Sequence, residues 1–508
     1  MSNFIPSPQQ QDFFNWVVDG HGSLVLEAVA GSGKTTTLIH GLSLMSGSIF
    51  FGAYNKKIAE EIKAKVSAAG LTNVNASTMH AEGFKIWRKA ASRVKIDAAK
   101  CRNIFRKKII EMRDARQEDQ ANELAQFESQ ILSLVSYAKQ AGVGILKQMA
   151  DDTVWLEMID HFNVDCLDNE TLVIRAARGL LKKSISMDFE VIDFDDMIYA
   201  PLVHNAKAYG YDWVLIDEAQ DTNASRRALA LMILKRGGRL VAVGDRHQAI
   251  YGFTGADADA LDLIAQAVSA TRLPLTITYR CPKAVVKYAQ TWVHHIQAAD
   301  TAPEGIVRSL KEDEKVSQAA EIGDAILCRF NAPLITQVYE FIAAGIPAKV
   351  EGREIGSGLK QLARRWKARS FDVLTVNLEK YLDRETSKFR AKEEESRAVA
   401  VEDKVNCLMV IMERCKSNPN NEKLNPVDAL CSEIDRIFDN DIDGGFITLS
   451  TIHKSKGREW NRVFWLQTGP SKWARKDWEL VQENNLCYVA ATRAKNELVL
   501  YTAPEKKA

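Results

Sequence analysis

Short apolar runs that end in polar loops and lead into amphipathic stretches dominate the start of the chain. Residues 23–27 (Ser-Leu-Val-Leu-Glu) and 49–54 (Ile-Phe-Phe-Gly-Ala-Tyr) are two such runs. The second is followed by residues 56–69, where apolar side chains recur every four positions until Gly70. Strands that alternate with helices predict a parallel sheet covered by helices. Further buried strands are predicted at residues 213–216, 240–243, 324–328, 446–450, 463–466 and 498–501.

Two long segments interrupt this alternation. Between residues 94 and 187 helical patterns replace the strands, for example at residues 103–113 and 124–139. Residues 353–445 are again helical and highly charged. We therefore expect an α/β fold with two parallel-sheet lobes, each carrying one helical insertion. The predicted parts are residues 1–93 with 188–272 for the first lobe, 94–187 for its insertion, 273–352 with 446–508 for the second lobe, and 353–445 for the second insertion.

Composition narrows the class of protein. A chain of 508 residues is too long for one core, and 46% hydrophobic with 26% charged residues is typical of globular proteins. The net charge of +1 excludes a strongly basic nucleic-acid coat, but it leaves room for a local basic groove. The 8 cysteines include no C-x-x-C pair, which argues for reduced thiols and against a zinc site. The N-terminus lacks a signal-peptide pattern, so a cytoplasmic protein is expected.

The strongest motif lies in the loop after the first predicted strand. Residues 28–35 read Ala-Val-Ala-Gly-Ser-Gly-Lys-Thr, which is G-x-x-x-x-G-K-T with alanine at the first glycine. Between a strand and a helix, such a loop wraps a polyphosphate with backbone N–H groups, while the lysine approaches the β/γ-phosphates. An incidental glycine-rich turn is the alternative, which the flanking elements disfavour. The predicted nucleotide-binding residues of the loop are Ala30, Gly31, Ser32, Gly33, Lys34, Thr35 and Thr36.

Two carboxylates follow the predicted strand at residues 213–216. Asp217 suits Mg²⁺ coordination together with the Thr35 hydroxyl, and Glu218 suits a general base that orients water. An acidic helix N-cap is the alternative interpretation of this pair. Together with the loop, the two carboxylates predict a nucleoside triphosphatase that uses Mg²⁺.

Three further blocks carry a family resemblance. Asp217-Glu218-Ala219-Gln220-Asp221, residues 243–253 (Val-Gly-Asp-Arg-His-Gln-Ala-Ile-Tyr-Gly-Phe) and residues 488–494 (Tyr-Val-Ala-Ala-Thr-Arg-Ala) resemble the UvrD/PcrA/Rep group of superfamily 1 DNA helicases. The form Ala53-Tyr54-Asn55-Lys56 is similar to the F-box helicase and phage-type branch. The resemblance implies two RecA-like motor lobes and an ATP-dependent DNA helicase that moves 3′ to 5′ along single-stranded DNA. It also implies that hydrolysis at the lobe interface drives unwinding at single-strand/duplex junctions.

The resemblance also implies roles for single residues. Positions similar to the nucleotide-contacting residues of the family are Gln10 (adenine), Gln248 (γ-phosphate), Tyr279 (base), Arg280 and Arg493 (phosphates) and Glu459 (ribose). With Lys34 and Glu218, the residues Gln248, Arg280 and Arg493 form the implied catalytic set. One departure is Thr36, which stands where the family often has a basic residue.

The DNA contacts rest partly on the resemblance and partly on spacing. Tyr251 and Phe253 lie two positions apart, so in an extended segment they share a face and can stack on successive bases. A place in the core is the alternative for these rings. Positions similar to strand-contacting residues of the family are Tyr54, Asn55, Lys56, Thr78, His80, Thr451 and His453.

Two functional hypotheses remain open at this stage. The first is a DNA helicase, and the second is a translocase or regulatory ATPase that remodels protein–DNA complexes or serves a replication, repair or defence partner without unwinding duplex. Both predict ATPase activity that single-stranded DNA stimulates. Only the first predicts strand separation by the chain alone.

Overall fold

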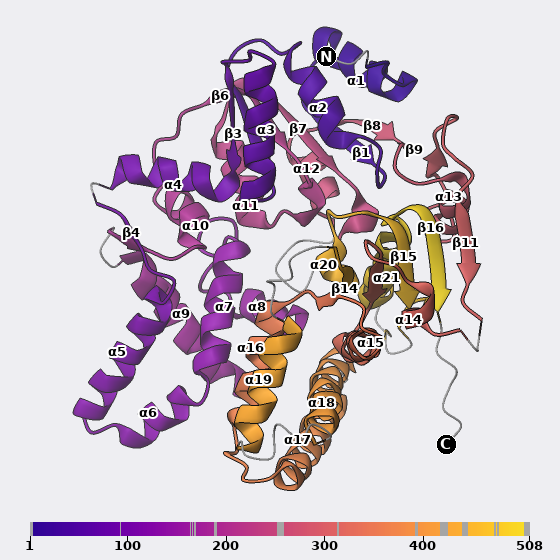
Figure 1. Ribbon diagram of the computed structural model, residues 1–508. Coiled ribbons are helices and arrows are strands. Elements are labelled where there is room, and N and C mark those ends of the chain that lie inside the picture. Colours follow the sequence, from indigo (N-terminus) through magenta and orange to yellow (C-terminus); the bar gives the residue numbers. More distant parts are fainter. Residues whose placement is uncertain are drawn as a thin grey trace. The chain divides into compact units, whose positions relative to one another are not determined.

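The computed structural model describes residues 4–91, 93–162, 164, 166, 169–186, 190–250, 259–311, 314–391, 395–416, 425–438, 445–471, 474 and 477–501. The chain forms two compact units (Figure 1). One consists of Met1–Ala28 and Gly33–Leu275, and the other of Val29–Ser32 and Thr276–Ala508. The predicted boundary at residue 272 is wrong in detail, because it falls inside a strand of the first sheet, Thr271–Leu275.

The first unit is built on a parallel sheet with the strand order β3-β2-β6-β7-β1-β8. The strands are β1 (Leu24–Ala28), β2 (Ile49–Ala53), β3 (Val74–Thr78), β6 (Tyr211–Ile216), β7 (Leu234–Gly244) and β8 (Thr271–Leu275). The predicted strands at residues 23–27, 49–54, 213–216 and 240–243 correspond to β1, β2, β6 and β7. These four lie inside the sheet, whereas β3 and β8 form its edges.

Helices cover both faces of this sheet. One face packs against α1 (Pro8–Asp19), α2 (Lys34–Leu42) and α3 (Lys56–Ala68). The other packs against α4 (Met79–Ala90), α10 (Asp196–Val203), α11 (Ala224–Met232) and α12 (Ala260–Ala267). Leu24 and Leu26 of β1 join the first core, and Val25 joins the second, as the alternation of side chains along a strand requires. This double burial explains the continuous apolar runs of the inner strands.

The first insertion forms a helical body with its own core. Its helices are α5 (Lys100–Asp114), α6 (Glu118–Ala125), α7 (Glu128–Gln140), α8 (Asp152–His161) and α9 (Glu170–Ser186), drawn in purple in Figure 1. A short strand pair at its base, β4 (Lys95–Ile96) with β5 (Val191–Ile192), was not expected from the sequence. The single helical pattern predicted at residues 124–139 is also wrong. Phe127, fully buried, lies at a break between α6 and α7.

The second unit contains another six-stranded parallel sheet, in the order β11-β16-β15-β12-β14-β13. Its strands are β11 (Ile306–Ser309), β12 (Ala325–Cys328), β13 (Ala348–Val350), β14 (Ile447–Thr451), β15 (Trp460–Leu466) and β16 (Ala494–Tyr501). A short pair, β9 (Ile277–Thr278) with β10 (Gln297–Ala298), lies apart from this sheet. The predicted strands at residues 324–328, 446–450, 463–466 and 498–501 correspond to β12, β14, β15 and β16.

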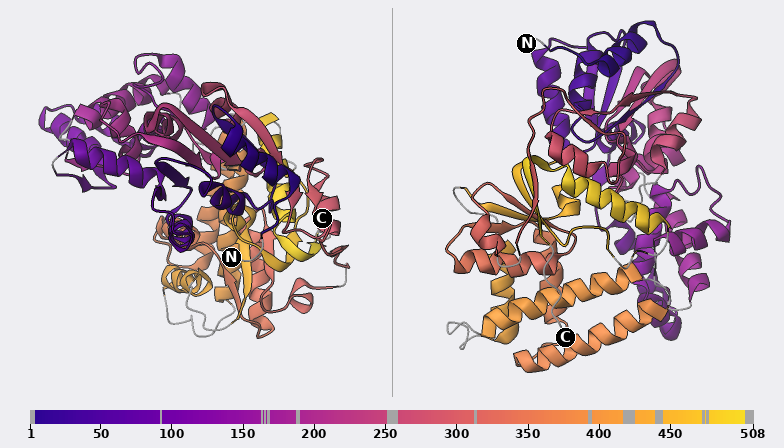
Figure 2. Two further views of the ribbon diagram at one scale, coloured as in Figure 1. Left: turned by 90° about the horizontal axis from the view of Figure 1, so that it is seen from above. Right: turned by 90° about the vertical axis from the view of Figure 1, so that its right-hand side faces the viewer.

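Helices of the second unit divide between the sheet and the second insertion. Those beside the sheet are α13 (Lys283–Ala289), α14 (Val316–Ala319), α15 (Asn331–Ala343), α20 (Ile452–Ser455) and α21 (Asp477–Ala491). The insertion contributes α16 (Arg353–Arg364), α17 (Phe371–Ala391), α18 (Glu395–Lys416) and α19 (Pro426–Phe438). The long helices α17 and α18 lie side by side (Figure 2). Apolar side chains of the insertion share one core with α15 and the sheet.

All eight cysteines are free thiols, as the sequence predicted. Seven are buried, and Cys101 is half-buried. Burial raises the pKa of Cys328 and of Cys487 to about 12, so these side chains stay neutral near pH 7. Among the described residues, no helix has the length and apolar character that crossing a membrane requires.

Candidate active site

Four polar side chains meet at the carboxyl edge of the first sheet. Lys34 and Thr35 open α2, and Asp217 and Glu218 follow β6 directly. The Lys34 Nζ atom lies 3.2 Å from Glu218 Oε1. The Thr35 hydroxyl donates a hydrogen bond to Asp217 Oδ2 at 3.3 Å. The fold therefore joins the two strongest motifs, which lie 182 residues apart at their Thr35–Asp217 contact.

The start of α2 is suited to an anion. Gly33, the N-cap, has φ 77° in the left-handed region, which glycine adopts without a steric penalty. No side chain of the described residues caps the helix, so its first N–H groups point outward with the positive end of the helix dipole. The Ser32 hydroxyl in the same loop is buried without a hydrogen-bond partner among the described residues. Ala30 is fully buried, Gly31 is half-buried, and Thr36 is exposed.

The electrostatics of the cluster favour a cation. Burial and the neighbouring Glu218 carboxylate raise the pKa of Asp217 to about 6, although Lys34 opposes the shift. Burial alone would lower the pKa of Lys34, but Glu218, Asp245 and Asp217 outweigh it and raise the pKa above its ordinary value. Because one ammonium faces three carboxylates, negative charge is in excess. Carboxylate and hydroxyl oxygens are the ligands that Mg²⁺ prefers, so Asp217 and Thr35 fit this metal.

Glu218 has an unusual backbone. Its φ of 52° and ψ of 44° lie in the left-handed region, which costs a non-glycine residue about 1 to 3 kcal/mol. Its N–H donates to Asp217 Oδ1 at 2.9 Å. The Gln220 side chain donates to Glu218 Oε2 at 2.5 Å, and its oxygen accepts from the Asp245 N–H at 3.1 Å. The surroundings therefore hold both the backbone and the carboxylate of Glu218.

Asp245 and Gln220 extend the site beyond the predicted residues. Asp245 follows β7, and its Oδ2 atom accepts from the buried side chain of Gln248 at 2.8 Å. Asp245 also contributes to the raised pKa of Lys34. The sequence did carry a signal for both residues, because each follows the end of a predicted buried strand. The hydrogen bond between them could not be predicted without knowing the strand order.

Gln10 lies at the start of α1 and is buried. Its side-chain oxygen accepts from the Ser7 N–H at 2.9 Å, and its amide donates to the Thr37 hydroxyl at 2.9 Å. The amide thus ties α1 to α2. In this arrangement Gln10 has a structural role, and its contact with adenine stays a prediction.

The second unit holds the remaining nucleotide-contacting candidates. Arg280 forms an ion pair with Glu459, and Lys495 lies 3.8 Å from the same carboxylate. Tyr279 is 52% exposed, so its ring is available for stacking. Arg493 is only 1% exposed, and its guanidinium donates to the carbonyl oxygens of Val489 at 3.0 Å and Arg458 at 3.2 Å. Backbone acceptors within its own unit therefore hold Arg493.

The predicted DNA contacts lie mostly at helix starts. The side chains of Asn55 and Thr78 cap α3 and α4 and accept N–H groups at 2.9 and 3.1 Å. Thr451 is the N-cap residue of α20. Lys56 is 90% exposed, with Glu60 at 3.7 Å. Tyr54 is 41% exposed. Tyr251 and Phe253 lie outside the described residues.

Two histidines of this set are held neutral. Burial, followed by Arg226, lowers the pKa of His80 to about 4. Burial, followed by Arg329 and Lys456, lowers the pKa of His453 to about 3. Both imidazoles are therefore uncharged near pH 7.

Two family models match the chain. The UvrD/REP helicase N-terminal domain matches residues 8–268, and the UvrD-like helicase C-terminal domain matches residues 360–505. The chain belongs to the UvrD-like helicase family. The predicted resemblance and the predicted α/β fold class are thereby confirmed.

Relatives of this UvrD-like helicase chain come from yeast and bacteria. It is 24% identical to F-box DNA helicase protein 1 of Schizosaccharomyces pombe over 94% of this chain and 55% of that protein. It is 25% identical to the ATP-dependent DNA helicase PcrA of Leuconostoc citreum, over 54% of this chain and 37% of that protein. For PcrA of Staphylococcus epidermidis, the identity is 24% over 58% of this chain and 41% of that protein. The chain thus spans about half or less of these relatives.

Proposed function

We propose that this UvrD-like helicase chain hydrolyses ATP to move along single-stranded DNA in the 3′ to 5′ direction and to unwind duplex. The observation that carries the proposal is the cluster of Lys34, Thr35, Asp217 and Glu218 at one sheet edge. Such a cluster combines an anion-binding helix start, a metal-binding pair and a carboxylate base. Supporting evidence comes from the two family domains and from relatives whose names describe DNA helicases.

In this proposal the start of α2 holds the phosphates of ATP. The N–H groups after Gly33 and the Lys34 ammonium bind phosphate oxygens, and Thr35 with Asp217 holds Mg²⁺. When bound, Mg²⁺ neutralises charge that develops on the phosphate oxygens. Glu218 accepts a hydrogen bond from the attacking water and orients it, while Gln248 acts as the γ-phosphate sensor.

The proposal also assigns nucleotide-binding roles to four residues of the second unit. Tyr279 would stack on the base, Glu459 would bind ribose, and Arg280 with Arg493 would stabilise phosphate charge. The C-terminal family domain covers Glu459 and Arg493 and supports their assignment, whereas Tyr279 and Arg280 lie between the two matched segments. Arg280 and Glu459 also form an ion pair with each other.

The partner in this proposal is single-stranded DNA, including junctions with duplex. Candidate contacts are Tyr54, Asn55, Lys56, Thr78, His80, Tyr251, Phe253, Thr451 and His453. Neutral His80 and His453 suit hydrogen bonding or base stacking. Stacking binds a strand without sequence preference.

The test measures ATP hydrolysis and strand separation by the purified chain. We expect single-stranded DNA to stimulate hydrolysis, and we expect separation of a duplex with a 3′ tail but not of a duplex with a 5′ tail. Glu218→Gln is the matched control, because it keeps the shape of the site while removing the carboxylate base. This variant should bind DNA without separating it.

Two results would contradict the proposal in different ways. Stimulated hydrolysis without strand separation on either substrate would favour the translocase or regulatory ATPase. Separation of the 5′-tailed duplex alone would reverse the proposed polarity while leaving the ATPase assignment intact.

A further inference from the structure

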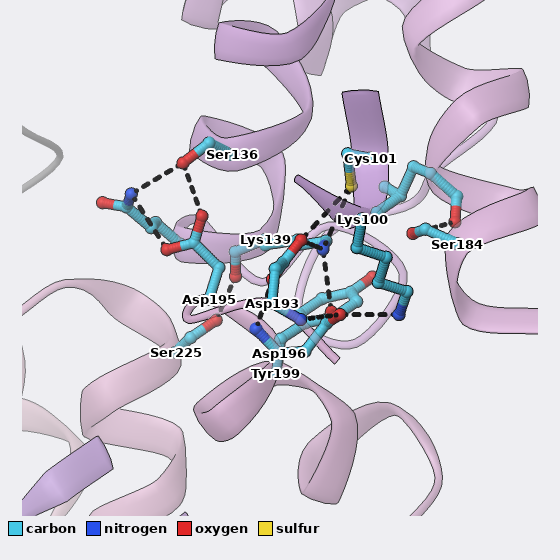
Figure 3. A network of polar contacts seen from close by, with 12 residues as sticks. Lys100, Cys101, Ser136, Lys139, Ser184, Asp193, Asp195, Asp196, Tyr199 and Ser225 are labelled. Atoms are coloured by element: carbon cyan, nitrogen blue, oxygen red, sulfur yellow. Dashed lines mark hydrogen bonds and ion pairs between the residues drawn. The ribbon is translucent and has the colours of Figure 1, made fainter. Parts of the chain in front are cut away.

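A buried charge network fixes the end of α7 in the first insertion (Figure 3). The Lys139 side chain, 1% exposed, reaches Asp193 Oδ2 at 2.5 Å and Asp196 Oδ1 at 2.8 Å. Lys100, the first residue of α5, reaches Asp196 Oδ2 at 2.7 Å. The two ammonium groups and the two carboxylates therefore neutralise one another's charge in a largely buried position. Together they join α5 and α7 to the start of α10.

The two carboxylates are themselves locked together. The Asp196 N–H donates to Asp193 Oδ1 at 2.9 Å, and the Asp193 N–H donates to Asp196 Oδ2 at 3.1 Å. Beside them, Asp195 accepts from the Ser136 hydroxyl at 2.5 Å. Ion pairs and hydrogen bonds therefore fix the position of the end of α7.

The same end of α7 contacts the start of α11. The Ser225 hydroxyl is buried and donates to the Lys139 carbonyl oxygen at 2.5 Å, as Figure 3 shows. One residue further along α7, the Gln140 side-chain oxygen accepts from the Asn223 amide at 3.4 Å. Lys139 is therefore held from two sides, through its ammonium by α10 and through its carbonyl by α11.

The start of α11 continues the turn that carries Glu218. The 3₁₀ helix η1 (Ala219–Asp221) follows Glu218 directly, and Asn223 is the N-cap of α11. The Asp221 N–H donates to the Glu218 carbonyl oxygen at 3.0 Å. A left-handed residue such as Glu218 persists only where the chain on both sides is held. The sheet holds the upstream side through β6, and α11 holds the downstream side.

We propose that Ser225 and Gln140 are positioning residues, through which the buried network of the insertion holds Glu218 in its left-handed conformation. Neither residue belongs to the proposed ATP-binding set, and both act through the backbone between Glu218 and Asn223. The helical insertion is then part of the hydrolytic machinery as well as an appendage of the lobe. This inference rests on the proposed role of Glu218 in hydrolysis.

Tyr199 provides a matched control beside the network. Its hydroxyl is buried and donates to the Val143 carbonyl oxygen at 2.5 Å, so it also binds the insertion just after α7. Tyr199 lies in α10, outside the segment that follows Glu218. Ser225→Ala and Tyr199→Phe each remove one buried hydroxyl bond to the insertion. Only the first change reaches the Glu218 turn.

The first measurement is steady-state ATP hydrolysis with saturating single-stranded DNA. For Ser225→Ala, we expect kcat to fall about three- to tenfold, the rate equivalent of one hydrogen bond's net contribution to holding Glu218 in place, with KM for ATP unchanged. For Tyr199→Phe, we expect kcat to stay within about twofold of the unmodified chain, because a bond lost elsewhere adds nothing to this barrier. Equal kcat values for the two variants would overturn the inference.

The second measurement is amide hydrogen exchange of the chain without nucleotide. Residues 218–223 should exchange faster in Ser225→Ala than in Tyr199→Phe, because the turn loses its outer support. Gln140→Ala provides a second route if Ser225→Ala fails to fold, and it should accelerate exchange in the same residues. Unchanged exchange there would overturn the inference even if the chain hydrolyses ATP. If the unmodified chain had no ATPase activity, the proposed function would be refuted. Faster exchange in Ser225→Ala would in that case still support the structural coupling.

Discussion

Replacing Lys34 with alanine should lower kcat for ATP hydrolysis by about 10² to 10³-fold, the usual effect of removing one stabilising group from a phosphate or oxyanion site. The reason is local, since Lys34 Nζ lies 3.2 Å from Glu218 and is the cation at the start of α2. The variant also leaves Asp217 and Glu218 without their counter-charge. The measurement is phosphate release in the presence of single-stranded DNA.

Lys63→Ala is the control for this change. Lys63 is an exposed lysine of α3 in the same unit, and its removal should leave hydrolysis unaltered. Binding of single-stranded DNA should survive in Lys34→Ala, because the change is confined to the nucleotide cluster. Loss of both hydrolysis and DNA binding would mean that the loop at residues 28–35 supports the fold rather than the chemistry.

Replacing Lys139 with methionine should lower the free energy of unfolding by about 3 to 5 kcal/mol, because it leaves buried carboxylates without a counter-charge. Methionine keeps most of the volume of lysine, so a cavity contributes little to the effect. The measurement is urea denaturation followed by circular dichroism, with hydrogen exchange to attribute the loss to the first unit.

Two comparison variants sharpen this prediction. The exposed pair Lys65–Glu61 has a similar distance, 2.7 Å, but side-chain exposures of 46% and 58%. Lys65→Met should therefore change the free energy of unfolding by less than about 1 kcal/mol. Combining Lys139→Met with Asp193→Asn restores the charge balance around Lys100 and Asp196, and it should recover part of the loss. A double variant less stable than Lys139→Met would contradict the charge argument.

The buried network around Lys139 stabilises the fold only within a certain pH range. Burial alone would raise the pKa of Asp193, but Lys139 outweighs it and holds the pKa below its ordinary value. Burial likewise opposes the charge of Lys139, but Asp196 and Asp193 raise its pKa. A lowered carboxyl pKa stabilises the fold above about pH 4, and a raised lysine pKa does so below about pH 10. The contribution is lost as pH falls below the first limit or rises above the second.

In the two six-stranded sheets, the strands that the sequence did not predict are those at the edges. β3 and β8 flank the first sheet, and β11 and β13 flank the second. An edge strand has one neighbour and is less completely covered, so it needs no continuous apolar run. β3 reads Val-Asn-Ala-Ser-Thr, and β8 carries a proline, which an edge tolerates. The inner strands are buried on both faces, and their composition made them predictable.

In the candidate site, too, contacts marked by short local motifs could be predicted, and contacts between unrelated distant positions could not. Lys34 and Thr35 belong to one short motif and Asp217 and Glu218 to another, and each motif marks a strand end. Parallel strands bring such ends to one edge, so the cluster could be expected. The ion pair between Lys139 and Asp193 joins positions 54 residues apart, and neither lies in a pattern that predicts the other. Its discovery needed the packing of the insertion against α10.

The burial of the cysteines has a practical consequence. Burial raises the pKa of Cys101, the half-buried thiol, to about 12, so almost none of it is the reactive thiolate near neutral pH. Engineered surface cysteines should therefore take up maleimide dyes selectively on the native background. One dye on each unit would then let fluorescence energy transfer follow the separation of the two units as nucleotide and DNA are added.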